Sequence, residues 1–318
     1  MNIIIVGQGS MGLLWYHHIQ QLFENSSDYH RAQLHLLASN RECSHREPSK
    51  TNHGDQYSFT DHNNVAHKGA VNYANIDHIK QADVIILCVK SFQILPALQE
   101  IENNVKNDSA IILAHNGMGT LNELSEKIKN SHNIYALLTT HGCLRSSPLT
   151  ITHTGIGSTD IGLLSGVTNI AQQHLLTDLL SSALPKVDYH NKIKYKQWLK
   201  LAINCIINPI TAINNIKNGQ VNDSVHLLTT KTLLEEVIII AKTQGVILSL
   251  NQLTETVAQV AQATARNTSS MRCDILANRK SEIDYINGYI HRLGIQLDIA
   301  TPENTKVWQT VKSLEAKQ

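Results

Sequence analysis

The stretch NIIIVGQGSMG, residues 2–12, decides the fold of this chain. Its first five residues are rich in Ile and Val and predict a strand that leads straight into three glycines, Gly7-x-Gly9-x-x-Gly12. This spacing permits a tight turn, a close approach of the backbone to a pyrophosphate, and close packing of the next helix on the strand. The start of that helix attracts phosphate groups. We therefore predict a dinucleotide-binding loop with contacts from Gly7, Gln8, Gly9, Ser10, Met11 and Gly12.

Downstream of this loop, strand patterns alternate with helical ones. The predicted strands at 83–89, 110–114 and 134–139 are apolar on both faces, which is typical of the central strands of a parallel sheet. A further strand is predicted at 34–38, and helices at 93–103 and 121–129. This alternation predicts an α/β fold whose N-terminal domain is Rossmann-type and doubly wound.

The pattern then changes in two steps. Residues 149–153 and 158–163, joined through Gly155 and Gly157, predict an antiparallel hairpin, and 186–190 a last short strand after a helix at 169–184. From residue 193 onward only helices are expected, at 194–215, 223–244, 249–266, 272–293 and 303–316. We therefore predict two domains, residues 1–190 and an all-α domain at 191–318. The polar stretch from about 40 to 70 is expected to be irregular, with a weak strand near 56–60.

The composition excludes several classes of protein. With 318 residues, 42% of them hydrophobic, the chain can form two cores, and a net charge of +1 does not favour binding to nucleic acid or to an anionic membrane. The N-terminus does not resemble a signal peptide, and no apolar run is long enough to span a membrane. The five cysteines are scattered and odd in number, which favours reduced thiols and a cytoplasmic protein. No metal site is expected, since the histidines at 45, 53, 62 and 67 lack a compact ligand spacing.

The residues after the second strand bear on which dinucleotide binds. An NAD site usually has Asp or Glu there to bond the ribose 2′-hydroxyl. This chain has Ser39, Asn40 and Arg41 instead. Arg41 would suit a 2′-phosphate, so we expect NADPH and NADP⁺ rather than NADH.

Polar residues follow three of the predicted central strands. Lys90 directly follows the strand at 83–89, Asn116 follows the one at 110–114, and residues 140–143 follow the third. Ligands of doubly wound sheets bind outside the carboxyl ends of the strands. We therefore expect Lys90 and Asn116 to face the same crevice as the glycine loop.

The run KLAINCIINP, residues 200–209, places three polar side chains inside an apolar helix. Lys200, Asn204 and Asn208 stand at i, i+4 and i+8, so they share one stripe of the helix. A lysine on so apolar a helix is rarely tolerated without a partner or a task. One ammonium and two amides in a row would hold and protonate a small oxygen-rich molecule, and Ser270, Asn218 and Glu282 lie in segments that could supply partners.

Taken together, the motifs resemble the ketopantoate reductase (2-dehydropantoate 2-reductase) family over nearly the whole chain. The segments that carry the resemblance follow one another with matching spacing: GQGSMG, LCVKSFQ around Lys90, AHNGMGT around Asn116, TTHGC ending at Cys143, KLAINCIINPITAI, the Asn218-Gly219 pair, NTSSM, EIDYING and TPENT. The resemblance implies a Rossmann domain and a helical domain of the 6-phosphogluconate dehydrogenase C-terminal type, with NADPH held between them. The implied reaction is reduction of ketopantoate to (R)-pantoate in the biosynthesis of pantothenate and coenzyme A.

The resemblance also implies roles for individual residues. Lys200 would be the general acid that protonates the ketone oxygen, and Asn116 would contact both cofactor and substrate. The substrate would be held by Asn204, Asn208, Asn218 and Ser270, and the cofactor by the glycine loop, Lys90, the Cys143 backbone and Glu282. The chain departs from the family at the end of the second strand, where Ser39 stands in place of an arginine often found there and Arg41 follows two residues later.

Two alternatives remain open at this stage. One is an NADP-dependent reductase of another small 2-keto acid, which would use the same loop and lysine. The other is a non-catalytic NADP-binding regulator, although a sensor would not need Lys200, Asn116 and Ser270 together. The family includes monomers and dimers, so a monomer or a homodimer is expected.

Overall fold

The computed structural model describes residues 1–38 and 54–317, which form two compact units. The first unit comprises Met1–His115 and Glu123–Ile193, and the second comprises Asn116–Asn122 and Lys194–Gln318. The second unit thus takes in a short segment that a division of the sequence at residue 190 assigns to the first. Met118 explains why, since its side chain is buried in the core of the helical unit.

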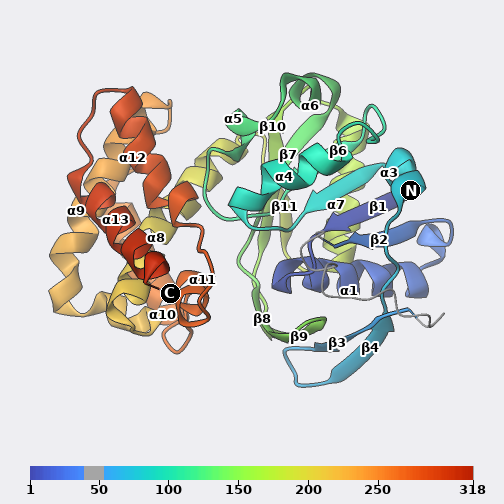
Figure 1. Ribbon diagram of the computed structural model, residues 1–318, viewed down its shortest axis with the longest axis horizontal. Coiled ribbons are helices and arrows are strands. Elements are labelled where there is room, and N and C mark those ends of the chain that lie inside the picture. The colour runs from blue at the N-terminus through green and yellow to red at the C-terminus, as the bar shows by residue number, and fades with distance from the viewer. Residues whose placement is uncertain (39–53, 318) are drawn as a thin grey trace. The chain divides into compact units, whose positions relative to one another are not determined.

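The first unit contains a large sheet with the strand order β11-β10-β7-β6-β5-β1-β2 (Figure 1). Its strands are β1 (Asn2–Val6), β2 (Gln33–Leu37), β5 (Val84–Leu87), β6 (Ala110–Leu113), β7 (Asn133–Thr139), β10 (Thr159–Ser165) and β11 (Val187–Tyr189). The first five run parallel, whereas β10 is antiparallel to β7. The predicted Rossmann-type sheet is confirmed, and β1 lies between β2 and β5, where the strand order reverses.

Helices connect these strands and cover the sheet. They are α1 (Ser10–Asn25), the short 3-10 helix η1 (Ser27–Tyr29), α3 (Ile76–Gln81), α4 (Ser91–Ile101), α6 (Glu126–Ser131) and α7 (Ile170–Ala183). The short helix α5 (Thr120–Glu123) belongs, except for its last residue, to the second unit. α1 and α7 contact each other. The sequence predicts one helix over 121–129, but the structure breaks it because Ser125 caps α6 through the Ile128 N–H.

A second sheet has the order β4-β3-β9-β8 and lies below α1 in Figure 1. It consists of β3 (Gln56–Thr60), β4 (Ala66–Ala70), β8 (Gly142–Ser147) and β9 (Thr150–Gly155). The weak strand expected at 56–60 is confirmed as β3. β4 was not predicted because an exposed edge strand, AHKGA, has no apolar alternation.

The predicted hairpin between 149–153 and 158–163 is wrong. β9 pairs with β8 and β3, whereas β10 joins β7 in the other sheet. The glycines at 155 and 157 therefore mark a crossing between sheets, not a tight turn. A Cβ on Gly157 would lie 2.4 Å from the Thr140 carbonyl carbon, so only glycine allows the chain to pass there.

The second unit is helical, as predicted from residue 193 onward. Its elements are α8 (Ile193–Asn214), the 3-10 helix η2 (Asn218–Asn222), α9 (Ser224–Thr243), α10 (Leu250–Ala263), α11 (Ser270–Leu276), the 3-10 helix η3 (Ile283–Tyr285), α12 (Asn287–Gln296) and α13 (Pro302–Ala316). A helical stretch is predicted near 272–293, and the structure divides it into α11, η3 and α12. No helix in the described part of the chain is both long and apolar enough to cross a membrane.

Candidate active site

The glycine loop joins β1 to α1 with each glycine in a distinct role. Gly7 has a φ of +102°, which favours glycine, and its N–H donates to the Leu37 carbonyl at 2.8 Å. A Cβ on Gly12 would lie 1.9 Å from the Gly7 carbonyl oxygen, so the helix can only start here with glycine. A Cβ on Gly9, by contrast, would meet nothing among the described residues closer than the Cys88 carbonyl oxygen at 4.0 Å.

The N-terminus of α1 can accept an anion. Gly9 occupies the N-cap position and provides no side-chain hydrogen bond to the first turn. Gln8 is buried, and its Oε1 has no hydrogen-bond partner within the described residues. Backbone N–H groups at such a terminus, with the positive end of the helix dipole, bind phosphate.

Two side chains from β8 contact this loop. Cys143 Sγ lies 3.4 Å from the Ser10 carbonyl oxygen, and burial raises the pKa of its thiol to about 12, so it stays protonated. Arg145 Nη1 donates to the Gln8 carbonyl at 3.1 Å, which brings a guanidinium to the loop. The sequence did not single out Arg145, because the strand β8 that carries it was not predicted.

Lys90 lies at the N-cap of α4, three residues after β5 ends. Its backbone N–H donates to Gln93 Oε1 at 3.2 Å. Because β5 pairs in parallel with β1, Lys90 and the glycine loop follow the carboxyl ends of neighbouring strands. Arg41, the expected 2′-phosphate contact, lies outside the described residues.

In the helical unit, α8 carries the predicted polar stripe. Lys200 and Asn204 are half-buried, and Asn208 is 7% exposed. The rest of the helix packs into the core through residues such as Leu201, Cys205 and Ile206. The Asn204 Nδ2 is buried without a hydrogen-bond partner among the described residues. A buried amide of this kind is costly unless something hydrogen-bonds to it, so it suits a ligand with oxygen acceptors.

Pro209 lies inside α8, one residue after the last polar residue of the stripe. Proline has no N–H, so the carbonyl four residues earlier, that of Cys205, loses its helical partner. Asn287 Nδ2 donates to this oxygen at 3.0 Å and to Asn304 Oδ1 at 2.9 Å. Asn287 thus restores the missing hydrogen bond beside Asn204.

One loop brings the other predicted substrate residues toward the end of this stripe. Ser269 caps α11 through the Arg272 N–H, and its hydroxyl lies 2.6 Å from that of Thr211 on α8. Ser270, the next residue, is exposed. Asn218 is buried, with its N–H donating to the Asn267 carbonyl and its Nδ2 to Thr264 Oγ1. Its Oδ1 has no partner in the described ranges. Thr211 was not singled out from the sequence, although it lies only three residues beyond Asn208.

Asn116 and Glu282 are hydrogen-bonded to each other. The Asn116 backbone N–H donates to Glu282 Oε1 at 3.3 Å and its Nδ2 to Oε2 at 3.1 Å. Glu282 is 5% exposed and Asn116 is half-buried, so the contact is partly shielded from solvent. The sequence placed Glu282 on a helix, but it lies in the turn just before η3. Gly117 makes the approach possible, because a Cβ there would lie 2.3 Å from the Tyr285 carbonyl oxygen.

Several histidines of the first unit gather where α1 meets β3 and β9. His17 stacks on Phe59 with ring centroids 3.8 Å apart, and His141 Nδ1 lies 3.1 Å from His153 Nε2. His62 and His67 of the polar stretch border this cluster, whereas residues 45 and 53 lie outside the described ranges. Within the described residues, no group of three or more His, Cys, Asp or Glu side chains is arranged to hold a metal.

Comparison with known proteins identifies the family of this chain. The family model "Ketopantoate reductase PanE/ApbA" matches residues 3–166, and "Ketopantoate reductase PanE/ApbA C terminal" matches residues 192–315. The 2-dehydropantoate 2-reductase of Vibrio cholerae is 32% identical over 315 residues, which cover 99% of this chain and 98% of that protein.

Solved structures show the same fold. A D-mandelate dehydrogenase, solved with NADH and anilino(oxo)acetate, has a TM-score of 0.85 at 22% identity and covers 100% of this chain and 99% of its own. A PanE/ApbA family ketopantoate reductase from Ralstonia eutropha has a TM-score of 0.81 at 21% identity, with the same coverage. The family models and the Vibrio cholerae relative define an oxidoreductase. The chain belongs to the ketopantoate reductase family.

Proposed function

We propose that this chain reduces ketopantoate to (R)-pantoate with NADPH, a step toward pantothenate and coenzyme A. The observation that carries the proposal is the stripe of Lys200, Asn204 and Asn208 on α8, in a chain with full-length similarity to a 2-dehydropantoate 2-reductase. A lysine with two amides matches a small acid that bears a ketone, a carboxylate and a hydroxyl.

The residues of the first unit fit a dinucleotide. The uncapped start of α1, the open face of Gly9 and the buried Oε1 of Gln8 are features that a bound pyrophosphate and its neighbouring groups would satisfy. The glycine loop, Lys90 and Arg145 would hold the phosphates, and the Asn116–Glu282 pair the groups nearer the substrate. When bound, NADPH supplies a hydride to C2 of the keto acid.

The side chains of the protein would donate the proton and orient the substrate. As negative charge develops on the ketone oxygen, the Lys200 ammonium would stabilise it and donate a proton to that oxygen. Asn204, Asn208, Asn218 and Ser270 would orient the carboxylate and hydroxyl. Asn116, held by Glu282, would place the carbonyl relative to the cofactor, and such positioning lowers the barrier by fixing reactants in advance.

The substrate-side roles predict a separation of kinetic constants. Asn208→Ala and Ser270→Ala are each expected to raise KM for ketopantoate about tenfold, the loss of roughly one good hydrogen bond, with kcat changed less. Ser270→Ala should leave α11 intact, because its cap is the neighbouring Ser269. Steady-state kinetics at saturating NADPH measure both constants.

Two exposed positions provide matched controls for these variants. Asn214→Ala removes an amide from the last turn of α8, and Ser313→Ala a hydroxyl that bonds only locally to the Gln309 carbonyl. Neither should change KM. An unchanged KM in Asn208→Ala and Ser270→Ala as well would show that the keto acid binds elsewhere.

The cofactor preference tests the roles of two arginines. Arg41→Ala is expected to reduce the preference for NADPH over NADH about tenfold, because only NADPH carries the 2′-phosphate. Arg145→Ala is expected to weaken the binding of both cofactors equally, because both share the pyrophosphate that the glycine loop would hold. Dissociation constants from nicotinamide fluorescence give the ratio. If Arg145→Ala shifts the ratio and Arg41→Ala does not, Arg145 is the residue that contacts the 2′-phosphate.

The proposed reaction is tested by NADPH oxidation with ketopantoate beside pyruvate, 2-ketoisovalerate and phenylglyoxylate. The last of these is the keto acid that corresponds to mandelate. Ketopantoate should have the highest kcat/KM. A higher value with another acid would make the chain a reductase of that substrate, and tight NADPH binding without any turnover would indicate a regulator.

A further inference from the structure

The turn that carries Glu282 is held by a helix that takes no part in the proposed chemistry. Ser281 is fully buried, and both its N–H and its hydroxyl donate to Glu315 Oε1 on α13, at 2.8 and 2.7 Å. The same hydroxyl accepts the Ile283 N–H at 3.2 Å. The residues on both sides of Glu282 are therefore tied, directly or through one hydroxyl, to a single carboxylate oxygen.

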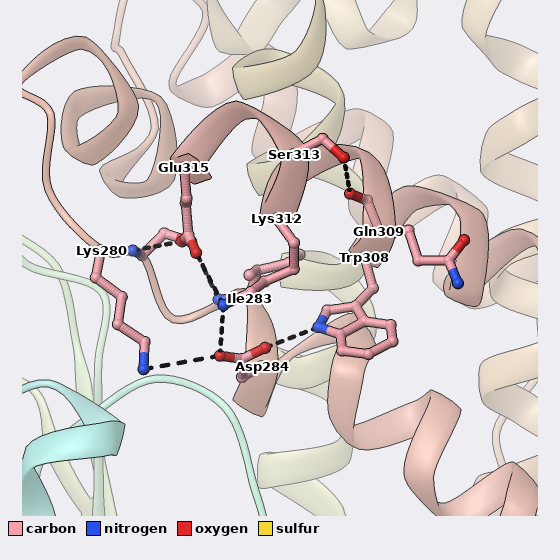
Figure 2. Close-up of polar contacts among 9 residues, drawn as sticks. Lys280, Ile283, Asp284, Trp308, Gln309, Lys312, Ser313 and Glu315 are labelled. Carbon is pink, nitrogen blue, oxygen red and sulfur yellow. Dashed lines mark hydrogen bonds and ion pairs between the residues drawn. The ribbon is translucent and has the colours of Figure 1, made fainter. Parts of the chain in front are cut away.

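A second carboxylate, that of Asp284 in η3, is tied to α13 as well. Figure 2 shows Asp284 accepting a hydrogen bond from Trp308 Nε1 at 2.8 Å and from Lys312 Nζ at 3.1 Å. Lys312 Nζ also lies 3.0 Å from Glu315 Oε2. Lys280 Nζ lies 3.9 Å from Asp284 Oδ2. Asp284, Lys312 and Glu315 thus form a continuous network from the turn to the end of α13.

Asp284 and Lys312 in this network are charged at neutral pH. Burial acts to raise the pKa of Asp284, but the hydrogen bonds from Trp308 and Lys312 outweigh it and the pKa is lowered. The pKa of Lys312 is raised, because Glu315 and Asp284 outweigh the opposite effect of burial. Charge-assisted hydrogen bonds are the stronger kind and hold their partners in defined geometry.

α13 is itself anchored firmly enough to act as a support. Val307 and Val311 are buried in the core of the unit. At its other end, the Glu236 carboxylate accepts the backbone N–H groups of Glu303 and Asn304 at 2.8 and 2.9 Å. The contacts of Glu315 therefore connect the turn at Glu282 to a helix that is packed into the core of the unit.

We propose that Glu315 is a positioning residue for the reaction, which acts through Ser281 to set the orientation of Glu282 and thereby of Asn116. The inference rests on the proposed function for its kinetic consequences. It does not place Glu315 in contact with substrate or cofactor, and it assigns the C-terminal helix a role in the arrangement of the site.

The test compares two substitutions of one side chain. Glu315→Leu removes the acceptor, and kcat/KM for ketopantoate is expected to fall about tenfold, because small displacements of positioning groups are costly in rate. Glu315→Gln keeps an oxygen that both Ser281 donors can use, so most of the lost kcat/KM should return. Equal loss in both variants would overturn the proposal.

Hydrogen exchange gives a readout that does not depend on activity. The Asn116 N–H bonds to Glu282 and the Met118 N–H to the Tyr285 carbonyl, so both amides report on the turn. In Glu315→Leu their exchange should accelerate more than that of buried amides of α9. Unchanged exchange at both positions would contradict the inference.

A double-mutant cycle decides whether Glu315 acts through Glu282. Glu282→Gln combined with Glu315→Leu should be little worse in kcat/KM than Glu282→Gln alone, because the second substitution then disturbs a group already altered. Fully additive losses would overturn the proposal. If Glu315→Leu does not fold, Ser281→Ala removes the hydroxyl contact with Glu315, keeps the backbone one, and enters the same cycle.

Glu235→Gln is the matched control. It removes a carboxylate from an exposed pair with Lys231 at 3.8 Å on α9 and should change neither kcat/KM nor the exchange of Asn116. If the unmodified enzyme does not reduce ketopantoate, the proposed function fails. The exchange comparison would still decide whether Glu315 holds the Asn116 segment.

Discussion

Replacement of Lys200 by alanine is expected to lower kcat by at least about a hundredfold while the enzyme still binds NADPH. The reason is that Lys200 would both neutralise the charge on the ketone oxygen and supply its proton, and positioned acid catalysis contributes about 10²–10⁴ in rate. A hundredfold loss corresponds to about 2.7 kcal/mol of transition-state stabilisation. Pre-steady-state hydride transfer, followed by NADPH absorbance, measures the step directly.

Two further lysine variants sharpen this experiment. Lys200→Arg keeps the positive charge but replaces a proton donor with a group that rarely deprotonates, so it should recover little of the lost rate. Lys194→Ala changes an exposed lysine on the same helix, which donates to the Gln244 carbonyl, and should leave kcat unchanged. A near-normal kcat in Lys200→Ala would remove Lys200 from the acid role.

Acid is expected to unfold the first unit at a higher pH than protonation of its carboxylates alone would require. Burial, aided by repulsion from neighbouring histidines, lowers the pKa of His17 to about 4 and that of His18 to about 3. Burial and His153 lower the pKa of His141 to about 4. All three therefore stay neutral in the folded protein at pH 5, whereas in the unfolded chain they would be protonated.

The sign of the effect follows from these directions. A histidine whose pKa is depressed by folding contributes its full stability above about pH 6.5, and this is lost progressively as the pH falls toward the folded value. At pH 5 each of the three would cost at most about 2 kcal/mol, and solvent screening reduces this for the less buried rings, so the sum is roughly 3 kcal/mol. That is a large fraction of the stability of many domains.

The groups that face this cluster do not cancel the effect. His67 of β4 and His153 of β9 add repulsion, and the exposed Asp61 offsets it only in part at His17 and His153. Tyr57 hydrogen-bonds His17 and has a raised pKa, so it is neutral. Circular dichroism between pH 8 and pH 4 should show the loss of stability beginning near pH 6.5.

Single substitutions identify the histidines responsible. His18→Leu should move the acid transition to lower pH, because the His18 Nε2 is buried without a hydrogen-bond partner in the described part of the chain. His174→Gln alters an exposed histidine on α7 and should leave the transition where it is. An acid transition that is the same in His18→Leu and the unmodified protein would contradict this account.

Local patterns predicted most of the elements. The strand at residues 2–6 and the helix after it follow from β-branched residues and three glycines, and the central strands from runs apolar on both faces. The predictions that failed concern strands whose pairing the local sequence does not show. β4 and β8 are held by backbone hydrogen bonds with exposed side chains, and the hairpin error arose because strands close in sequence were assumed to pair.

The candidate site divides in the same way. The glycine loop and the stripe on α8 each lie within a short stretch of consecutive residues, so the spacing of those residues was enough to predict them. The contacts that arrange them join residues distant in sequence: Asn116 with Glu282, Asn287 with the Cys205 carbonyl, and Arg145 with the glycine loop. No local pattern marks such pairs.

By itself, the sequence determined the class of fold, the loop suited to a dinucleotide and the identity of the polar groups on α8. All three depend on the periodicity of apolar residues and on the backbone conformations open to glycine, and both are properties of residues close together in the sequence. Only the tertiary structure decided which carboxylate holds Asn116, which amide replaces the hydrogen bond lost at Pro209, and which helix holds the turn of Glu282. Those outcomes depend on hydrogen bonds between buried groups that meet only after the chain has packed.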